Sequence, residues 1–183
     1  MLILVIGVAL WWAAHFFKRV APEPRAALGD KGKGIVAVLL VLSVILMVVG
    51  YRMADGPFWW GPSPALKGIN NLLMLAALWF FAADGMKSNL VRRIRNPQLT
   101  GFSLWAVAHL LVNGDLPSFV LFGGLLVWAV VEMMVLNRAG PAWSRSTQPV
   151  IWRKEGMVLL AAFVTMVVIG LIHGWLGYNP FGG

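Results

Sequence analysis

Six apolar runs separated by short polar segments are the feature that most constrains this chain. Most of them approach the length of about 20 apolar residues that an α-helix needs to cross a bilayer. The runs cover residues 2–17, 34–51, 69–83, 99–112, 119–136 and 157–176. The sequence therefore predicts an all-α integral membrane protein, with six transmembrane helices in a single domain over residues 1–183.

The composition agrees with a chain that lies in lipid. Hydrophobic residues make up 60% of the chain and charged residues only 12%, whereas a soluble domain is about half apolar and a quarter charged. A chain of 183 residues has too little interior to bury so much apolar surface. These values exclude a soluble enzyme and a disordered tail. The absence of cysteine excludes disulfides, iron–sulfur clusters and a thiolate nucleophile.

The basic residues indicate an orientation in the membrane. Of the 15 Lys and Arg residues, 13 fall in the segments after the first, third and fifth runs. These are Lys18, Arg19, Arg25, Lys31, Lys33, Lys87, Arg92, Arg93, Arg95, Arg138, Arg145, Arg153 and Lys154. The positive-inside rule then places both termini on the non-cytoplasmic side. Basic residues in such loops suit anionic lipid, so we expect membrane lipid and no nucleic acid as a partner.

The link between the fourth and fifth runs and the start of the first run each carry a further prediction. The fourth and fifth runs are separated only by residues 113–117, which are rich in turn-forming types, so we expect a tight helical hairpin. A re-entrant fourth run would leave five spans and spoil the charge pattern. The first run has no basic segment before it and no evident cleavage site. We therefore expect it to be a retained helix rather than a signal peptide.

Three histidines lie within or at the ends of apolar runs: His15, His109 and His173. Ionisable residues at membrane depth are costly, so each marks a candidate site. Two histidines on different helices can bind a metal or a haem iron; the alternative is a hydrogen bond between helices. His15 falls near the inner surface, whereas His109 lies up to about 18 Å along its helix. Their pairing therefore requires the fourth helix to tilt or to begin below the surface.

Other polar and aromatic residues extend the candidate site. Phe102, Trp105 and His109 share one helical face, which suits a flat macrocycle and suits ordinary packing equally well. Glu132 near the inner end of the fifth run is either a proton-relay or cation-binding carboxylate or a partner of the basic loops. Arg95 precedes the fourth helix directly and is the best candidate for a specific contact with an anion.

Two segments around the second histidine resemble the NnrU family of bacterial membrane proteins. They are residues 95–101 (RNPQLTG) and 104–115 (LWAVAHLLVNGD). The resemblance implies a multi-pass protein of the bacterial inner membrane, associated with denitrification and nitric oxide metabolism. The family also includes the plant 15-cis-zeta-carotene isomerase, a haem b protein with histidine ligands.

That resemblance assigns roles to individual residues. It places the axial ligands of a haem b on His15 and His109, with Arg95 and Lys18 near the propionates and Phe102 and Trp105 beside the haem. The isomerase has a cysteine, implicated in ligand switching, where this chain has Ala106. The family usually has a histidine where this chain has Asn96. The implied partners are nitric oxide or a lipophilic small-molecule substrate.

Two alternatives remain open. Arg95, Asn96, Pro97 and Gly101 also resemble a short motif of the isoprenylcysteine and phospholipid methyltransferases, which bind S-adenosylmethionine near the cytosolic surface. In that interpretation Arg95 and Glu132 serve a cofactor that is bound at the cytosolic side of the membrane. The other alternative is a non-catalytic scaffold that helps a membrane protein partner to assemble, with the histidines serving only as hydrogen-bond donors.

Overall fold

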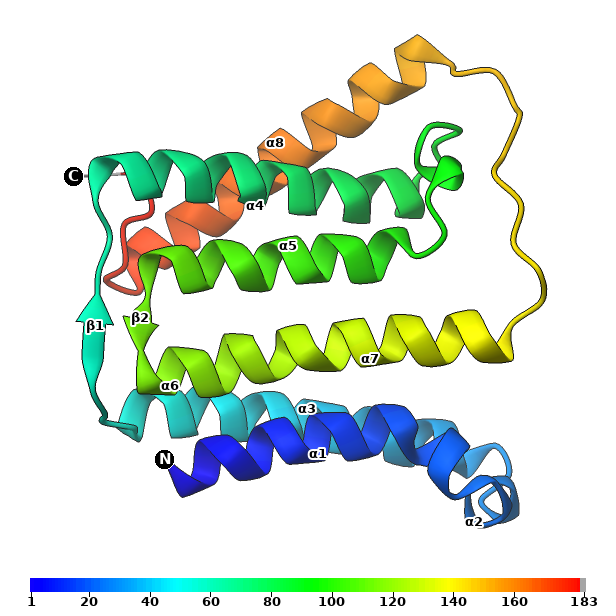
Figure 1. Cartoon of the computed structure of the whole chain (residues 1–183), viewed down its shortest axis with the longest axis horizontal. Coiled ribbons are helices and arrows are strands. Elements are labelled where there is room, and N and C mark those ends of the chain that lie inside the picture. The colour runs from blue at the N-terminus through cyan, green and yellow to red at the C-terminus, as the bar shows by residue number, and fades with distance from the viewer. Residues whose placement is uncertain (182–183) are drawn as a thin grey trace. The chain divides into compact units, whose positions relative to one another are not determined.

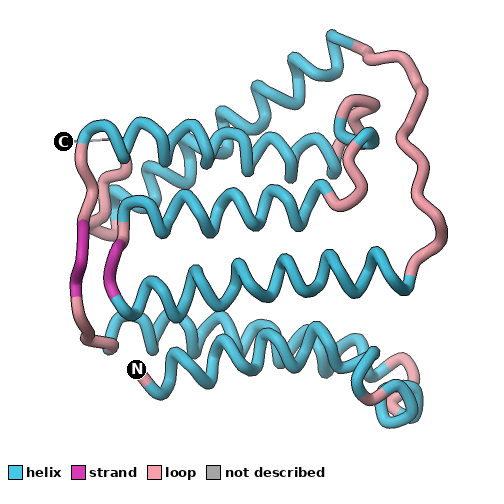
Figure 2. Tube along the Cα trace, in the orientation of Figure 1, coloured by secondary structure: helices cyan, strands magenta, loops and turns pink. Residues whose placement is uncertain are grey.

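The computed structural model describes residues 1–181, which are mostly helical (Figures 1 and 2). The longer helices are α1 (Leu2–Val20), α3 (Lys31–Met53), α4 (Pro64–Gly85), α5 (Pro97–Val112), α7 (Gly124–Ala139) and α8 (Trp152–Trp175). The short elements are α2 (Pro22–Ala27), β1 (Phe58–Trp60), η1 (Val91–Arg93), β2 (Gly114–Asp115), α6 (Leu116–Ser118) and η2 (Phe119–Gly123).

Five helical segments are long and apolar enough to cross a membrane. They are α1, α3, α4, α8 and the continuous segment Leu116–Ala139 that contains α6, η2 and α7. They coincide with five of the six expected runs, so the chain has the helices of a multi-pass membrane protein. The remaining run forms α5, which has 16 residues. At 1.5 Å per residue it is about 24 Å long, shorter than the hydrocarbon core of about 30 Å.

Two short segments differ from the expectation. Residues 113–117 form more than a turn, because β2 pairs with β1 in a two-stranded sheet and the Leu116 N–H donates to the Pro57 carbonyl oxygen at 3.0 Å. The proline-containing segment before α4 is extended, and its strand β1 pairs with β2. Pro22 lies in the first turn of α2, where its fixed φ is compatible with a helix, so this part of the expected loop is helical.

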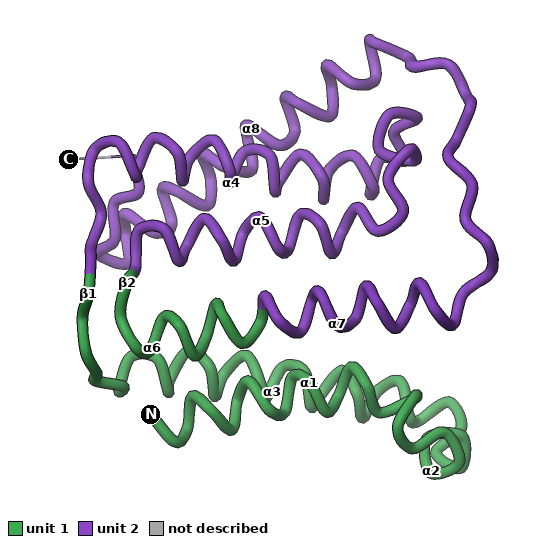
Figure 3. The backbone as a smooth tube through the Cα atoms, in the orientation of Figure 1, with its two compact units in different colours: residues 1–59, 114–125 green, residues 60–113, 126–183 purple. Residues whose placement is uncertain are grey.

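The chain divides into two compact units, each described separately (Figure 3). Unit 1 comprises residues 1–59 and 114–125, and unit 2 comprises residues 60–113 and 126–183. In unit 1, α1 packs closely against α3. A Cβ on Gly50 would lie 2.6 Å from the Leu4 Cα, so the two backbones approach closely only because a glycine is present. The Trp12 indole also donates to the Gly124 carbonyl oxygen at 3.1 Å.

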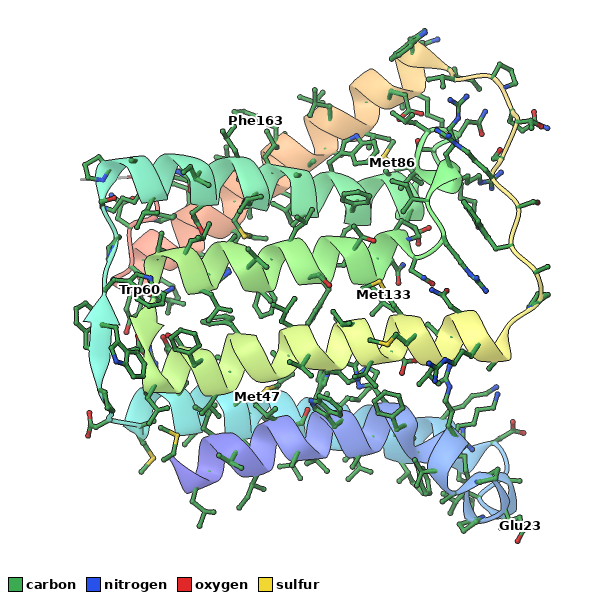
Figure 4. The ribbon with its side chains drawn as sticks, in the orientation of Figure 1. Glu23, Met47, Trp60, Met86, Met133 and Phe163 are labelled. Carbon is green, nitrogen blue, oxygen red and sulfur yellow. The ribbon has the colours of Figure 1, made fainter. Side chains whose placement is uncertain are left out.

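Unit 2 is built on α4, which packs against both α5 and α8. Its buried core contains Ala83, Val91 and Val158, with Met86 packed against them (Figure 4). The opposite face of α8 is apolar and exposed; Phe163, for example, is 55% exposed. An apolar face of this kind is suited to lipid.

A buried hydrogen bond fixes the start of α8 in unit 2. The Ser88 hydroxyl lies 2.7 and 2.8 Å from the two carboxylate oxygens of Glu155 and donates to that group. Both side chains are buried. The N–H groups of Leu90 and Val91 donate in turn to the Ser88 oxygen, so one hydroxyl connects the loop after α4 to α8.

Candidate functional site

All three histidines make the same hydrogen bond within their own helix. His15 Nδ1 lies 2.9 Å from the Trp11 carbonyl oxygen, His109 Nδ1 lies 2.9 Å from that of Trp105, and His173 Nδ1 lies 2.8 Å from that of Ile169. A carbonyl oxygen only accepts, so Nδ1 carries the proton and Nε2 carries the ring's lone pair. Metal-binding histidines are oriented by a hydrogen bond of this kind.

Two of the histidines also contact a tryptophan four residues earlier. The ring centroids of Trp11 and His15 are 4.3 Å apart, and those of Trp105 and His109 are 5.0 Å apart. The same Trp-x-x-x-His arrangement therefore occurs on α1 and on α5. Trp105 is among the candidate residues predicted from the sequence and Trp11 is not, although both tryptophans precede a histidine by four residues.

A row of aromatic rings leads from α7 to His109 within unit 2. Trp128 packs edge-to-face on Phe102, with ring centroids 5.2 Å apart. The ring centroids of Phe102 and Trp105 are 5.0 Å apart, and Trp105 in turn contacts His109. The three α5 residues lie along one helical face, as their spacing predicts. Glu132 follows Trp128 by one helical turn and is 8% exposed. These rings form an apolar wall on one side of His109.

His109 and His173 line the same pocket in unit 2. The cavity has a volume of about 60 Å³ and is bounded by α4, α5, α8 and the C-terminal segment. The sequence places His173 in the last apolar run but does not show which residues surround it, because spacing along one helix does not reveal neighbours from another.

The pocket also contains Asn70 and Asn71, which stand at the start of the third apolar run. Helix α4 begins before them, at Pro64, and is capped by Ser63, whose hydroxyl oxygen accepts from the Leu66 N–H at 3.2 Å. The two asparagines therefore lie inside the helix. Asn70 Nδ2 donates to Asn71 Oδ1 at 3.1 Å, and Asn71 Nδ2 donates to the Pro180 carbonyl oxygen at 3.2 Å.

Arg95 and Lys18 have different surroundings. Arg95 donates through one guanidinium nitrogen to the carbonyl oxygens of Asn137 at 2.9 Å and Pro141 at 3.4 Å. It thus stabilises the C-terminal end of α7, where carbonyl groups lack helical partners, and it does not line the pocket of His109. Lys18 is exposed in the last turn of α1. Lys18 and His15 belong to unit 1, whereas Arg95 and His109 belong to unit 2.

The described residues contain no group of three or more His, Cys, Asp or Glu side chains arranged to hold a metal ion. Haem iron does not need such a group, because the macrocycle supplies four of its ligands and the protein supplies only the axial ones.

The apolar helices and the polar residues that they hold define a multi-pass helical membrane protein with histidines in its helices. The family model described as "NnrU protein" matches residues 3–180. The chain belongs to the NnrU family, over nearly its whole length. No curated protein and no solved structure matches it.

Proposed function

We propose that this NnrU-family protein binds haem b in the bacterial inner membrane, with His15 and His109 as the axial ligands. The observation that carries the proposal is the repeated Trp-x-x-x-His arrangement on α1 and α5, in which Nδ1 donates to a backbone carbonyl oxygen. That hydrogen bond orients each ring and places the lone pair on Nε2, the atom that binds haem iron. The donor set therefore fits the group.

The aromatic row gives His109 a suitable setting for this role. Trp105 packs against the His109 ring, and Phe102 packs against Trp105, so we infer that these rings restrict rotation of His109 and shield one side of it from water. Arg95 has five N–H donors in its guanidinium group, and the two carbonyl contacts share one of its nitrogens. The other nitrogens of Arg95, and the exposed ammonium of Lys18, are the groups that we assign to the haem propionates.

A bound haem with two histidine ligands supplies one-electron transfer, and with one axial position open it binds nitric oxide or the double bond of a lipophilic substrate. The proposed function is accordingly in nitric oxide and denitrification metabolism or in isomerisation of a lipophilic molecule. No contact among the described residues specifically favours the methyltransferase or the scaffold alternative.

We also propose that α5 completes a six-helix topology with both termini on the non-cytoplasmic side. The distribution of 13 of the 15 basic residues supports this arrangement. The 16 residues of α5 are sufficient where the bilayer thins locally around a short helix.

Single substitutions of the histidines test the ligand assignment. We expect His15→Ala and His109→Ala each to convert a six-coordinate, low-spin haem spectrum into a five-coordinate one or to remove the haem. His173→Ala is the matched control, since His173 has the same local hydrogen bond but is not assigned to the iron. An unchanged six-coordinate spectrum in His109→Ala contradicts the assignment.

A further inference from the structure

A groove runs along the contact between α4 and α8 in unit 2, where the two helices cross obliquely (Figure 1). It has a volume of about 360 Å³ and is lined by Leu75 of α4 and by Gly156, Leu159, Leu160 and Phe163 of α8. Sites for small ligands have volumes of about 300–1,000 Å³ and a mostly apolar lining. The groove has both properties, and its exposed Phe163 (Figure 4) shows that it opens on the surface of the helix pair.

Gly156 provides the free space in this groove. A Cβ added to Gly156 would meet no atom within 4 Å, whereas a Cβ on Gly50 would overlap the Leu4 backbone. Gly50 thus permits close helix packing, and Gly156 has no such role in the described part of the chain. Glycine also weakens a helix relative to most residues. The missing side chain leaves room for a molecule from outside the chain.

Positive charges lie at the end of the groove where α8 begins. Arg153 precedes Gly156 by three residues and Leu160 by seven, so these three residues share one helical face. Arg153 is exposed. The ammonium group of Lys154 donates to the Lys87 carbonyl oxygen at 3.0 Å, which brings the exposed residue Lys87 to the start of α8 as well. Three basic residues therefore lie at one end of an apolar groove.

The neighbouring acid does not offset these charges at the surface. Glu155 is buried, and its carboxylate accepts a hydrogen bond from the Ser88 hydroxyl. Trp152, one residue before Arg153, is 76% exposed. Tryptophan is enriched at the level of the lipid headgroups, so the start of α8 has the composition of a membrane interface.

We propose that this groove is a specific site for one anionic phospholipid. Arg153 and Lys154 bind the headgroup phosphate, and one acyl chain lies along the groove from Gly156 to Phe163. The distance from Arg153 to Phe163 along the helix is ten residues, or about 15 Å. This equals the hydrocarbon thickness of one leaflet, half of about 30 Å.

The charges at one end of the groove distinguish a phospholipid from other occupants. A second copy of the chain, docked symmetrically on this face, would bring Arg153 and Lys154 against the same two cations. A neutral lipophilic molecule would fill the apolar part without using the cations. An anionic phospholipid matches both the apolar part and the charged end.

The lipid site is independent of the haem proposal. It uses α4, the start of α8 and the loop after α4, whereas the haem proposal uses His15, His109 and the residues around them. A lipid-facing surface in general exchanges lipids without preference. The proposed site instead holds one lipid of a stated charge, which makes it measurable in a detergent-purified chain.

The test is native mass spectrometry of the full chain, delipidated in detergent and titrated with phosphatidylglycerol or with phosphatidylcholine of the same acyl chains. We expect one phosphatidylglycerol per chain to bind before any others, and phosphatidylcholine to bind more weakly. Each basic residue near an anionic headgroup contributes about a fivefold gain in affinity. Arg153→Gln and Lys154→Gln should each weaken phosphatidylglycerol binding by about this factor and leave phosphatidylcholine binding unchanged.

Arg52→Gln is the matched control for charge. Arg52 is exposed in the last turn of α3, in unit 1, so the variant loses the same net charge at a distant point of the sequence. It should bind phosphatidylglycerol as the parent does. Equal weakening by Arg52→Gln and Arg153→Gln means that net charge alone attracts the lipid, and overturns the site.

Gly156→Leu tests the groove itself. The new side chain occupies the space without a clash at its Cβ, so the chain should fold and elute as the parent does. We expect loss of the one-lipid complex with both phospholipids. Gly174→Leu is the matched control on α8, because a Cβ on Gly174 also meets no atom within 4 Å, and it should retain the complex.

Three results overturn the lipid site. They are a parent chain that binds the two phospholipids equally well or not at all, a Gly156→Leu variant that binds them as the parent does, and a chain dimer that Gly156→Leu dissociates. The last result assigns the groove to a second copy of the chain. None of them affects the haem proposal, and a chain without haem that shows the expected lipid binding leaves the lipid site in place.

Discussion

At the scale of the residue, the chemistry of the histidines is set by the helix that carries them. Each Nδ1 meets the carbonyl oxygen four residues earlier, and this contact is the same at His15, His109 and His173. The sequence predicts which residues are candidates, because ionisable side chains are rare at membrane depth. It does not predict that His109 and His173 line one pocket, since that arrangement arises from the packing of separate helices.

The Ser88 hydroxyl provides a prediction at the same scale. Ser88→Ala leaves the buried Glu155 carboxylate and two loop N–H groups without their partner. Loss of a hydrogen bond to a buried charged group costs about 1.5–3 kcal/mol, so thermal unfolding in detergent should shift clearly to lower temperature. Ser103→Ala is the control, because the Ser103 hydroxyl donates only to the Leu99 carbonyl oxygen of its own helix. Equal stability of the two variants contradicts this account.

At the scale of the element, hydrophobicity and length predicted the helices well. Five of the six apolar runs are helices long enough to span a membrane, because a run of apolar residues in lipid must satisfy its backbone internally. The pairing of β1 with β2 was not predicted, since neither strand has more than three residues and no alternation is visible over so short a length. The apolar run 69–83 also did not predict that α4 begins earlier, at Pro64.

The close approach of α1 and α3 leads to a second prediction. Gly50→Ala places a Cβ against the Leu4 backbone, and overpacking of this kind costs about 1–3 kcal/mol. Gly34→Ala on the same helix meets nothing within 4 Å and should be neutral or stabilise by up to about 1 kcal/mol. Thermal unfolding of both variants in detergent measures the difference. A Gly50→Ala variant as stable as Gly34→Ala means that the helices do not pack as described.

At the scale of the whole molecule, the chain has the helices of a multi-pass membrane protein of the NnrU family. The resemblance around His109 identified the family correctly, because residues 104–115 form a specific block. The number of spans depends on α5, whose 16 residues lie at the lower limit of what crosses a bilayer.

The topology can be tested directly, because the chain has no cysteine. Single substitutions Asp55→Cys, Ser146→Cys and Tyr178→Cys place one thiol in each of three exposed segments. With six spans, a membrane-impermeant reagent applied from the cytoplasmic side labels Ser146→Cys and neither of the others. With a re-entrant α5, the labelling of Ser146→Cys and Tyr178→Cys is exchanged, and the six-span arrangement is wrong.

The most direct test of the central proposal is the visible absorption spectrum of the purified chain, recorded oxidised and then reduced with dithionite, with haem counted as the pyridine haemochrome. We expect close to one haem per chain, a sharp Soret band and resolved bands in the reduced state, as two histidine ligands produce. A folded chain that stays colourless after reconstitution with haem contradicts the proposal that His15 and His109 bind haem b.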